Sequence, residues 1–125
     1  MELKHDCVRA LLLTIEEEAK IDNHFSLDQL KEMPRLKDFD RDDIAYTAIK
    51  LKEADFINAE HFYSDDTLGG IVVSNLTYAG HQFLDNIRDG KVWKEVKKQA
   101  SNFSSISLAI LAELAGAYIK STLNI

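Results

Sequence analysis

The sequence has few cysteines, prolines and glycines, which are the residues that cross-link small folds or shape loops. Its 125 residues include a single cysteine, Cys7, which excludes an internal disulfide framework and a cysteine-based zinc finger. One proline and five glycines leave little room for a loop-rich or all-β fold. The hydrophobic content of 46% is too high for a disordered chain, and the length fits one domain.

Long hydrophobic runs are also missing. The run 11–13 is too short for a signal peptide. The apolar stretch Ile106–Ile119 contains Glu113 and falls short of the roughly 20 residues that a membrane-spanning helix needs. We therefore expect a soluble, cytoplasmic protein without membrane contact, in which Cys7 is a buried, reduced thiol.

Apolar residues recur at helical spacing in six segments, which are 3–20, 27–33, 40–52, 77–88, 91–99 and 106–123. Ser26 is suited to cap the second segment and Thr77 to cap the fourth, while Pro34 ends the second. Between the third and fourth helices the period changes. Segments 55–63 and 71–76 are rich in aromatic and β-branched residues and predict two strands, joined by a turn over 64–70.

This order predicts a mainly α (α+β) fold with a winged helix-turn-helix core. The two-stranded hairpin would be the wing, and the helix from 40 would be the one that enters the major groove in DNA-binding members of this fold. We assign residues 1–89 to the winged-helix domain and 90–125 to a C-terminal helical extension that serves oligomerisation.

Several short strings point to a family. The string HDCVR near the start, and LTYAGHQFLDNIRD followed closely by VW, resemble a family of small uncharacterised proteins from bacteria and their phages, known only as a domain of unknown function. The resemblance covers roughly residues 3–100. It implies a winged-helix-like domain, often carried on prophages, and no catalytic residues to carry over.

The net charge of -6 is unevenly distributed. Residues 1–75 hold nine basic and seventeen acidic residues, whereas 76–125 hold six and four. The groove-reading helix and the wing tip are both acidic, and their carboxylates would repel phosphates. We therefore expect a non-enzymatic protein that binds a host or phage protein, in an anti-defence or regulatory role. The expected acidic face consists of Asp40, Asp42, Asp43, Asp65 and Asp66.

The alternative is a dimeric DNA-binding transcription regulator. Its phosphate and base contacts would come from Arg41, Lys50, Lys52, Lys91, Lys94 and Lys98. Trp93 lies among the last three lysines and has two interpretations. It either stacks on a base, or it faces the core or a partner together with Val92 and Val96 while the lysines are solvated.

Signatures of catalysis are missing: the chain has no P-loop, GxGxxG, GxSxG or HExxH motif. Histidines 5, 24, 61 and 81 are scattered. His81 and Asp85 have a spacing that suits two metal ligands, but no third ligand is evident. We expect no enzyme activity, no metal and no cofactor.

The last helix is apolar nearly all round, which predicts burial on two faces. One face consists of Ile106, Ile110, Leu114, Ala117 and Tyr118, and the second of Leu108, Leu111, Ala115 and Ile119. Since a small domain offers one face to pack against, we assign the second set to a homodimer interface. The alternative is that the helix folds back into its own core.

Overall fold

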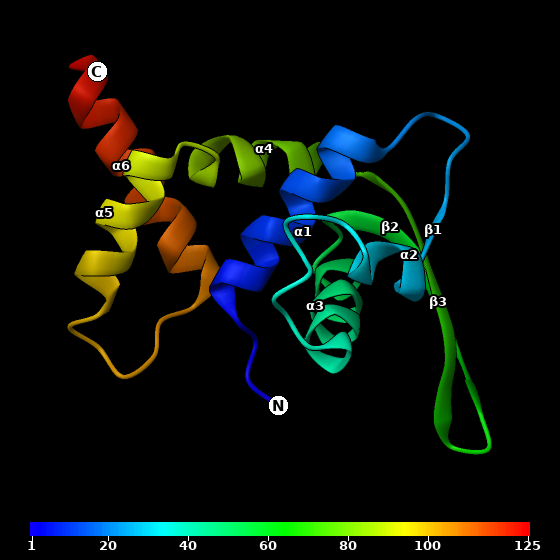
Figure 1. Ribbon diagram of the computed structural model, residues 1–125. Coiled ribbons are helices and arrows are strands. Elements are labelled where there is room, and N and C mark those ends of the chain that lie inside the picture. Colours follow the sequence, from blue (N-terminus) through cyan, green and yellow to red (C-terminus); the bar gives the residue numbers. More distant parts are fainter. The chain divides into compact units, whose positions relative to one another are not determined.

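The computed structural model describes all residues, 1–125. It contains six helices and a three-stranded antiparallel sheet (Figure 1), which confirms the mixed α+β class and is compatible with a winged-helix-like fold. The elements are α1 (His5–Glu18), β1 (Phe25–Ser26), α2 (Leu27–Lys31), α3 (Arg41–Glu53), β2 (Ile57–Ser64), β3 (Thr67–Leu76), α4 (Tyr78–Ile87), α5 (Gly90–Ala100) and α6 (Leu108–Leu123).

The chain divides into two compact units, Met1–His81 and Gln82–Ile125. The boundary predicted at residue 89 lies inside the second unit. Counting charges by unit gives nine basic and seventeen acidic residues in the first, and six and four in the second. The acidic excess of the chain therefore belongs to the first unit alone. No helix in either unit is long and apolar enough to cross a membrane.

The core of the first unit is built on the apolar stripe of α1. Cys7, Val8, Leu11 and Ile15 are fully buried, and α1 packs against α3 and β3. Burial raises the pKa of the Cys7 thiol, because a thiolate would be poorly solvated there. The prediction of a buried Cys7 is confirmed.

Ser26 caps α2 as predicted, with a reciprocal capping box. The backbone N–H of Gln29 donates to Ser26 Oγ at 3.2 Å, and the Ser26 N–H donates to Gln29 Oε1 at 2.8 Å. The helix itself is shorter than predicted and ends at Lys31. Phe25 and Ser26 also form β1, a strand too short for the sequence to predict, which pairs with β3 and gives the sheet order β1-β3-β2.

The turn predicted over 64–70 is wrong in extent, because β3 already begins at Thr67. Ser64 pairs with Thr67, so the loop consists only of Asp65 and Asp66. Both aspartates have positive φ, 52° and 63°, as the central residues of a tight hairpin loop require. The hairpin is thus longer than predicted and projects beyond the helices of the first unit (Figure 1).

Gly69 and Gly70 lie within β3 and not in a turn, and the reason for glycine at these positions is steric. The ring of Phe62 on β2 lies across both residues. A Cβ added at Gly69 would be 2.7 Å from the ring, and one at Gly70 would be 2.9 Å from it. Both distances are below 3.0 Å, which real Cβ contacts essentially never show. The two glycines therefore make room for an aromatic ring on the hairpin.

The start of α4 is tied to the backbone before β2. As predicted, Thr77 caps the helix: its Oγ1 accepts from the Gly80 N–H at 3.0 Å. The same hydroxyl donates to the Asp55 carbonyl at 2.6 Å, and the Thr77 N–H donates to the Phe56 carbonyl at 3.0 Å. Gly80 lies so close to Phe56 that an added Cβ would be 2.9 Å from its carbonyl carbon and closer still to its oxygen.

In the second unit α5 packs against α6. The side chains of Trp93, Val96, Leu111 and Ala115 are buried. Side chains cap both helices: Asp89 Oδ1 accepts from the Lys91 and Val92 N–H groups. Ser107 Oγ accepts from the Ile110 N–H in the same way.

Candidate functional site

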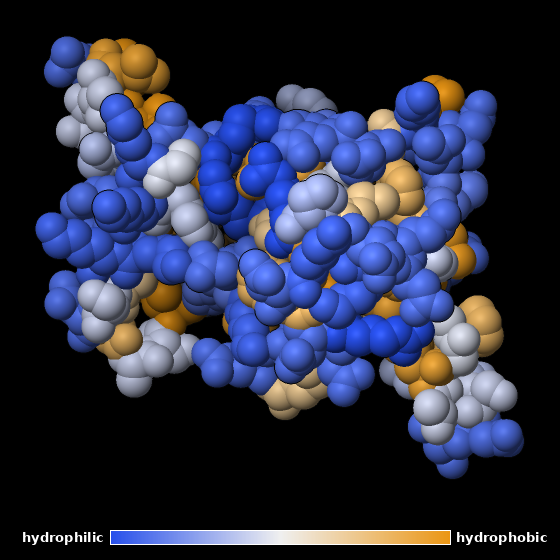
Figure 2. All heavy atoms as spheres, viewed as in Figure 1, coloured by the Kyte–Doolittle hydropathy of each residue, from blue (hydrophilic) through white to orange (hydrophobic).

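The β2–β3 hairpin, residues 57–76, is referred to below as the wing. It contains no lysine and no arginine. Two adjacent aromatic residues, Phe62 and Tyr63, are 59% and 62% exposed, and Asp65 and Asp66 follow at the tip. Figure 2 shows orange atoms on the stem of the wing and blue atoms at its tip. The wing therefore combines exposed apolar surface with negative charge, and it offers no lysine or arginine to a phosphate.

The start of α3 carries two of the predicted acidic residues on its surface, the N-cap residue Asp40 and Asp42 in the first turn. Asp40 and Asp42 are exposed, and the Asp40 side chain makes no cap hydrogen bond to the helix. Asp43 is different, because it is only 8% exposed and its Oδ2 lies 2.7 Å from Lys4 Nζ. This hydrogen bond and the Asp43 charge raise the pKa of Lys4. Asp43 therefore does not belong to the exposed acidic face, which corrects the prediction. Its carboxylate is buried and pairs with Lys4.

The wing and the start of α3 lie on one side of the first unit. A hollow of about 160 Å³ is lined by Asp28, Arg41 and the stem of the wing, Leu68–Ile71. Arg41 donates to Asp28 Oδ1 at 3.1 Å through Nη2 and at 3.2 Å through Nε. This basic residue of α3 is therefore already paired with a carboxylate. The acidic face that remains consists of Asp40, Asp42, Asp65 and Asp66.

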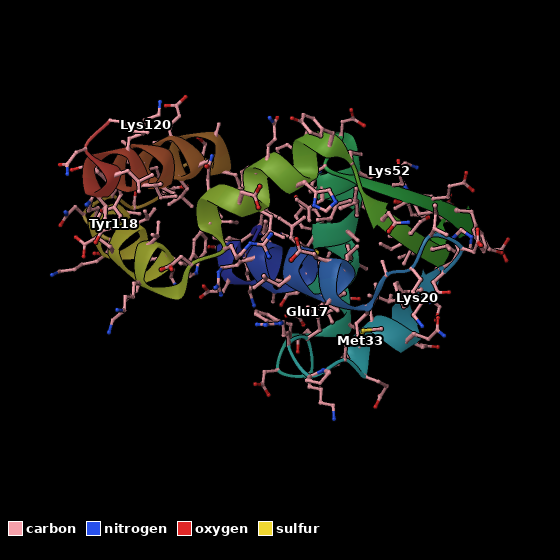
Figure 3. All side chains as sticks on the ribbon, turned by 90° about the horizontal axis from the view of Figure 1, so that it is seen from above. Glu17, Lys20, Met33, Lys52, Tyr118 and Lys120 are labelled. Atoms are coloured by element: carbon pink, nitrogen blue, oxygen red, sulfur yellow. The ribbon has the colours of Figure 1, made fainter.

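A wider groove of about 550 Å³ lies beside α2 and has an acidic rim. Its apolar lining comes from Phe25, Met33 and Pro34, and its carboxylates from Glu18, Asp28 and Glu32, with Gln29 completing it. Figure 3 shows Met33 near the C-terminal end of α1. Sequence reasoning missed this groove, although acidic Glu32 next to apolar Met33 and Pro34 was a local signal for it.

The basic residues at the end of α3 are only partly available. Lys50 Nζ lies 3.0 Å from Glu53 Oε2 and 5.3 Å from the centroid of the Tyr46 ring. The Glu53 hydrogen bond raises the pKa of Lys50. Lys52 is half-buried at the same end of the helix (Figure 3). Of the three basic residues predicted to read DNA from α3, two already have carboxylate partners.

The lysines of α5 form an exposed row. Lys91, Lys94 and Lys98 all lie in solvent, whereas Val92 and Trp93 are buried, with Trp93 only 6% exposed. Of the two interpretations of Trp93, the structure supports the one in which its side chain is buried, because a buried indole has no free face on which a base could stack. The row retains positive charge but has no aromatic side chain to stack.

The histidines do not gather around a common point. His81 Nδ1 lies 3.8 Å from Glu16 Oε2, while its proposed metal partner Asp85 forms an ion pair with Arg88 at 3.0 Å. His24 Nδ1 lies 3.2 Å from Ser74 Oγ, and His61 packs edge-on against Tyr63 with its Nδ1 buried and without a hydrogen bond. No group of three or more potential ligands is found.

The structure reverses the roles of the two faces of α6. Leu111 and Ala115, assigned to a dimer interface, are 1% and 0% exposed, and Leu108 and Ile119 on the same face are half-buried. The reason is that α6 packs on α5 within the unit, so this face serves the chain's own core. The other face is exposed, with Ile110 at 47% and Tyr118 at 38%.

A comparison with family models identifies the chain. The model described as "Hypothetical protein (DUF2513)" matches residues 2–107. The chain belongs to the DUF2513 family. This match covers nearly all of the first unit, including the wing, and continues through α5 to the residue before α6, and it confirms the resemblance to a domain of unknown function. No curated protein and no solved structure matches the chain.

Proposed function

We propose that this DUF2513 protein is a non-enzymatic, winged-helix-like binding protein that recognises another protein through its acidic face. The observation that carries the proposal is the wing, in which exposed Phe62 and Tyr63 adjoin Asp65 and Asp66 without any lysine or arginine. A winged helix that binds DNA places its wing near the phosphate backbone, where carboxylates are repelled. The same wing suits a protein partner that presents lysine or arginine beside apolar residues.

The acidic rim of the groove beside α2 supports the same partner chemistry. A basic side chain has an aliphatic stem and a charged head. The stem fits against Met33 and Pro34, and the head would lie near Glu18 or Glu32. Asp40 and Asp42 extend the negative surface at the start of α3. The proposal includes a phage or prophage origin and a cytoplasmic, anti-defence or regulatory role, in which the acidic surface occupies a basic surface of a host protein.

The test compares two variants that remove the same amount of charge. In D65N/D66N the tip becomes neutral while asparagine keeps the left-handed backbone, which it tolerates well. In the control D22N/E95Q two carboxylates outside the wing are neutralised. Affinity capture from bacterial extract with quantitative mass spectrometry should show partners that the first variant loses and the control retains. Equal retention by both variants would contradict binding through the wing.

DNA binding is the alternative, and the exposed lysine row of α5 favours it. Mobility-shift assays at low salt with mixed duplexes should detect binding that K91Q/K94Q/K98Q abolishes and that falls steeply with added salt. Absence of a shift at low salt supports the protein-binding proposal. A shift that requires these lysines would instead support a DNA-binding regulator.

A further inference from the structure

The outer face of α6 is an apolar surface that the chain itself leaves uncovered. Ile110 and Tyr118 are 47% and 38% exposed, Ala117 is exposed and Leu114 is half-buried. These four residues follow one another at spacings of four, three and one positions, which places their side chains on adjoining parts of one helix face. Leu111 and Ala115 lie on the adjoining side of the helix and are buried. Figure 2 shows further orange atoms at the C-terminal end of α6, where Leu123 is 61% exposed.

Two opposite charges flank this face. Glu113 and Lys120 are both exposed, and no ion pair is found for either of them within the chain. Lys120 projects from the side of α6 turned away from α5 (Figure 3). The two residues are seven positions apart, so they share one side of the helix about 10 Å from each other and cannot pair within one chain.

We propose that the outer face of α6 binds a second copy of this chain in an antiparallel helix pair. A two-fold axis through the midpoint between Glu113 and Lys120 sets each Glu113 level with Lys120 of the other copy. The axis passes beside Ala117, whose small side chain lets the two helices approach closely. Ile110 and Leu114 then pack into the seam on either side of the axis, in the manner of an antiparallel coiled coil.

Charge complementarity selects this partner and this orientation. The antiparallel pair forms two opposite-charge contacts at once, because the same surface is used by both copies. A parallel pair would set each residue level with its own counterpart, so that the two opposite charges would not meet. The surface therefore fits a second copy better than a uniformly charged partner. It also differs from the acidic face of the first unit, and the inference stands apart from the proposed function.

The test is charge reversal in the full chain, read by sedimentation velocity from low to high micromolar concentration. E113K and K120E each convert both contacts to like-charge pairs, and each should weaken the dimer about tenfold. The double variant E113K/K120E restores two opposite-charge contacts and should regain the wild-type dissociation constant. K94E and E95K on α5 are matched controls that should leave the dimer unchanged.

Mixing the two single variants gives the sharpest result. The E113K chain carries two lysines on this flank and the K120E chain carries two glutamates. Only a mixed dimer satisfies both contacts, so heterodimers should form where each variant alone is mainly monomeric. A wild-type chain that stays monomeric at high micromolar concentration would overturn the inference. So would a dimer that neither reversal weakens, since another surface would then hold it together.

Discussion

Replacing Gly80 by alanine probes the contact that fixes the start of α4. An added Cβ would be 2.9 Å from the carbonyl carbon of Phe56 and closer to its oxygen, so the helix must move away from that backbone. The movement strains the Thr77 hydrogen bonds to Asp55 and Phe56, which measure 2.6 and 3.0 Å. Each bond is worth about 1 kcal/mol net, and overpacking adds about 1–3 kcal/mol.

Alanine also gains up to about 1 kcal/mol of helix propensity over glycine, which offsets part of this cost. We expect G80A to lower the free energy of unfolding by about 2–3 kcal/mol, measured by urea denaturation followed by circular dichroism. The control is G116A, since a Cβ there would meet only Asn86 Nδ2 at 3.9 Å, an ordinary contact. G116A should be as stable as wild type or more so. A G80A protein of wild-type stability would refute the close approach of α4 to Phe56.

Three further predictions concern local features of the first unit. D66G relieves a positive φ of 63° in the hairpin loop and should stabilise the fold by about 0.5 kcal/mol in urea denaturation, whereas a loss would contradict the two-residue loop. The Arg35 hydrogen bond lowers the pKa of Glu17, so the pair stabilises the fold above the unfolded pKa of about 4.3 and its contribution is lost as pH falls through the folded value. R35Q should therefore cost about 0.5 kcal/mol at neutral pH, a difference that shrinks below about pH 4 and that would not shrink if the pair were absent. Buried Cys7 should resist thiol reagents in the native state and react after denaturation, and fast native labelling would contradict its burial.

The helices could be predicted from the sequence because their signals are local. The stripe of α1, the Ser26 cap and the Thr77 cap depend on neighbours within four residues. The length of the wing depends instead on a contact between Phe62 and two glycines that follow it seven and eight positions later in the chain. The glycine pair of β3 has the composition of a turn, and only the ring of Phe62 across it explains why the strand continues.

Two site assignments failed for a similar reason. Asp43 lies in a helix first turn, where carboxylates are usually solvated, but Lys4 reaches it from a position 39 residues earlier in the chain. Both faces of α6 are apolar, so the sequence could not decide which of them the chain covers. That choice depends on where α5 lies. Leu111 and Ala115, which were expected to be uncovered, are buried, whereas Ile110 and Ala117 are exposed.

The two proposed surfaces have a joint consequence. The wing belongs to the first unit and the outer face of α6 to the second, so each can be altered without touching the other. A dimer through α6 would carry two acidic wings related by a two-fold axis. A partner with two basic sites would then be held twice, and its apparent affinity would exceed that of one wing through effective concentration. Loss of the α6 contact should therefore weaken capture of such a partner, whereas a partner with one site should be captured equally by monomer and dimer.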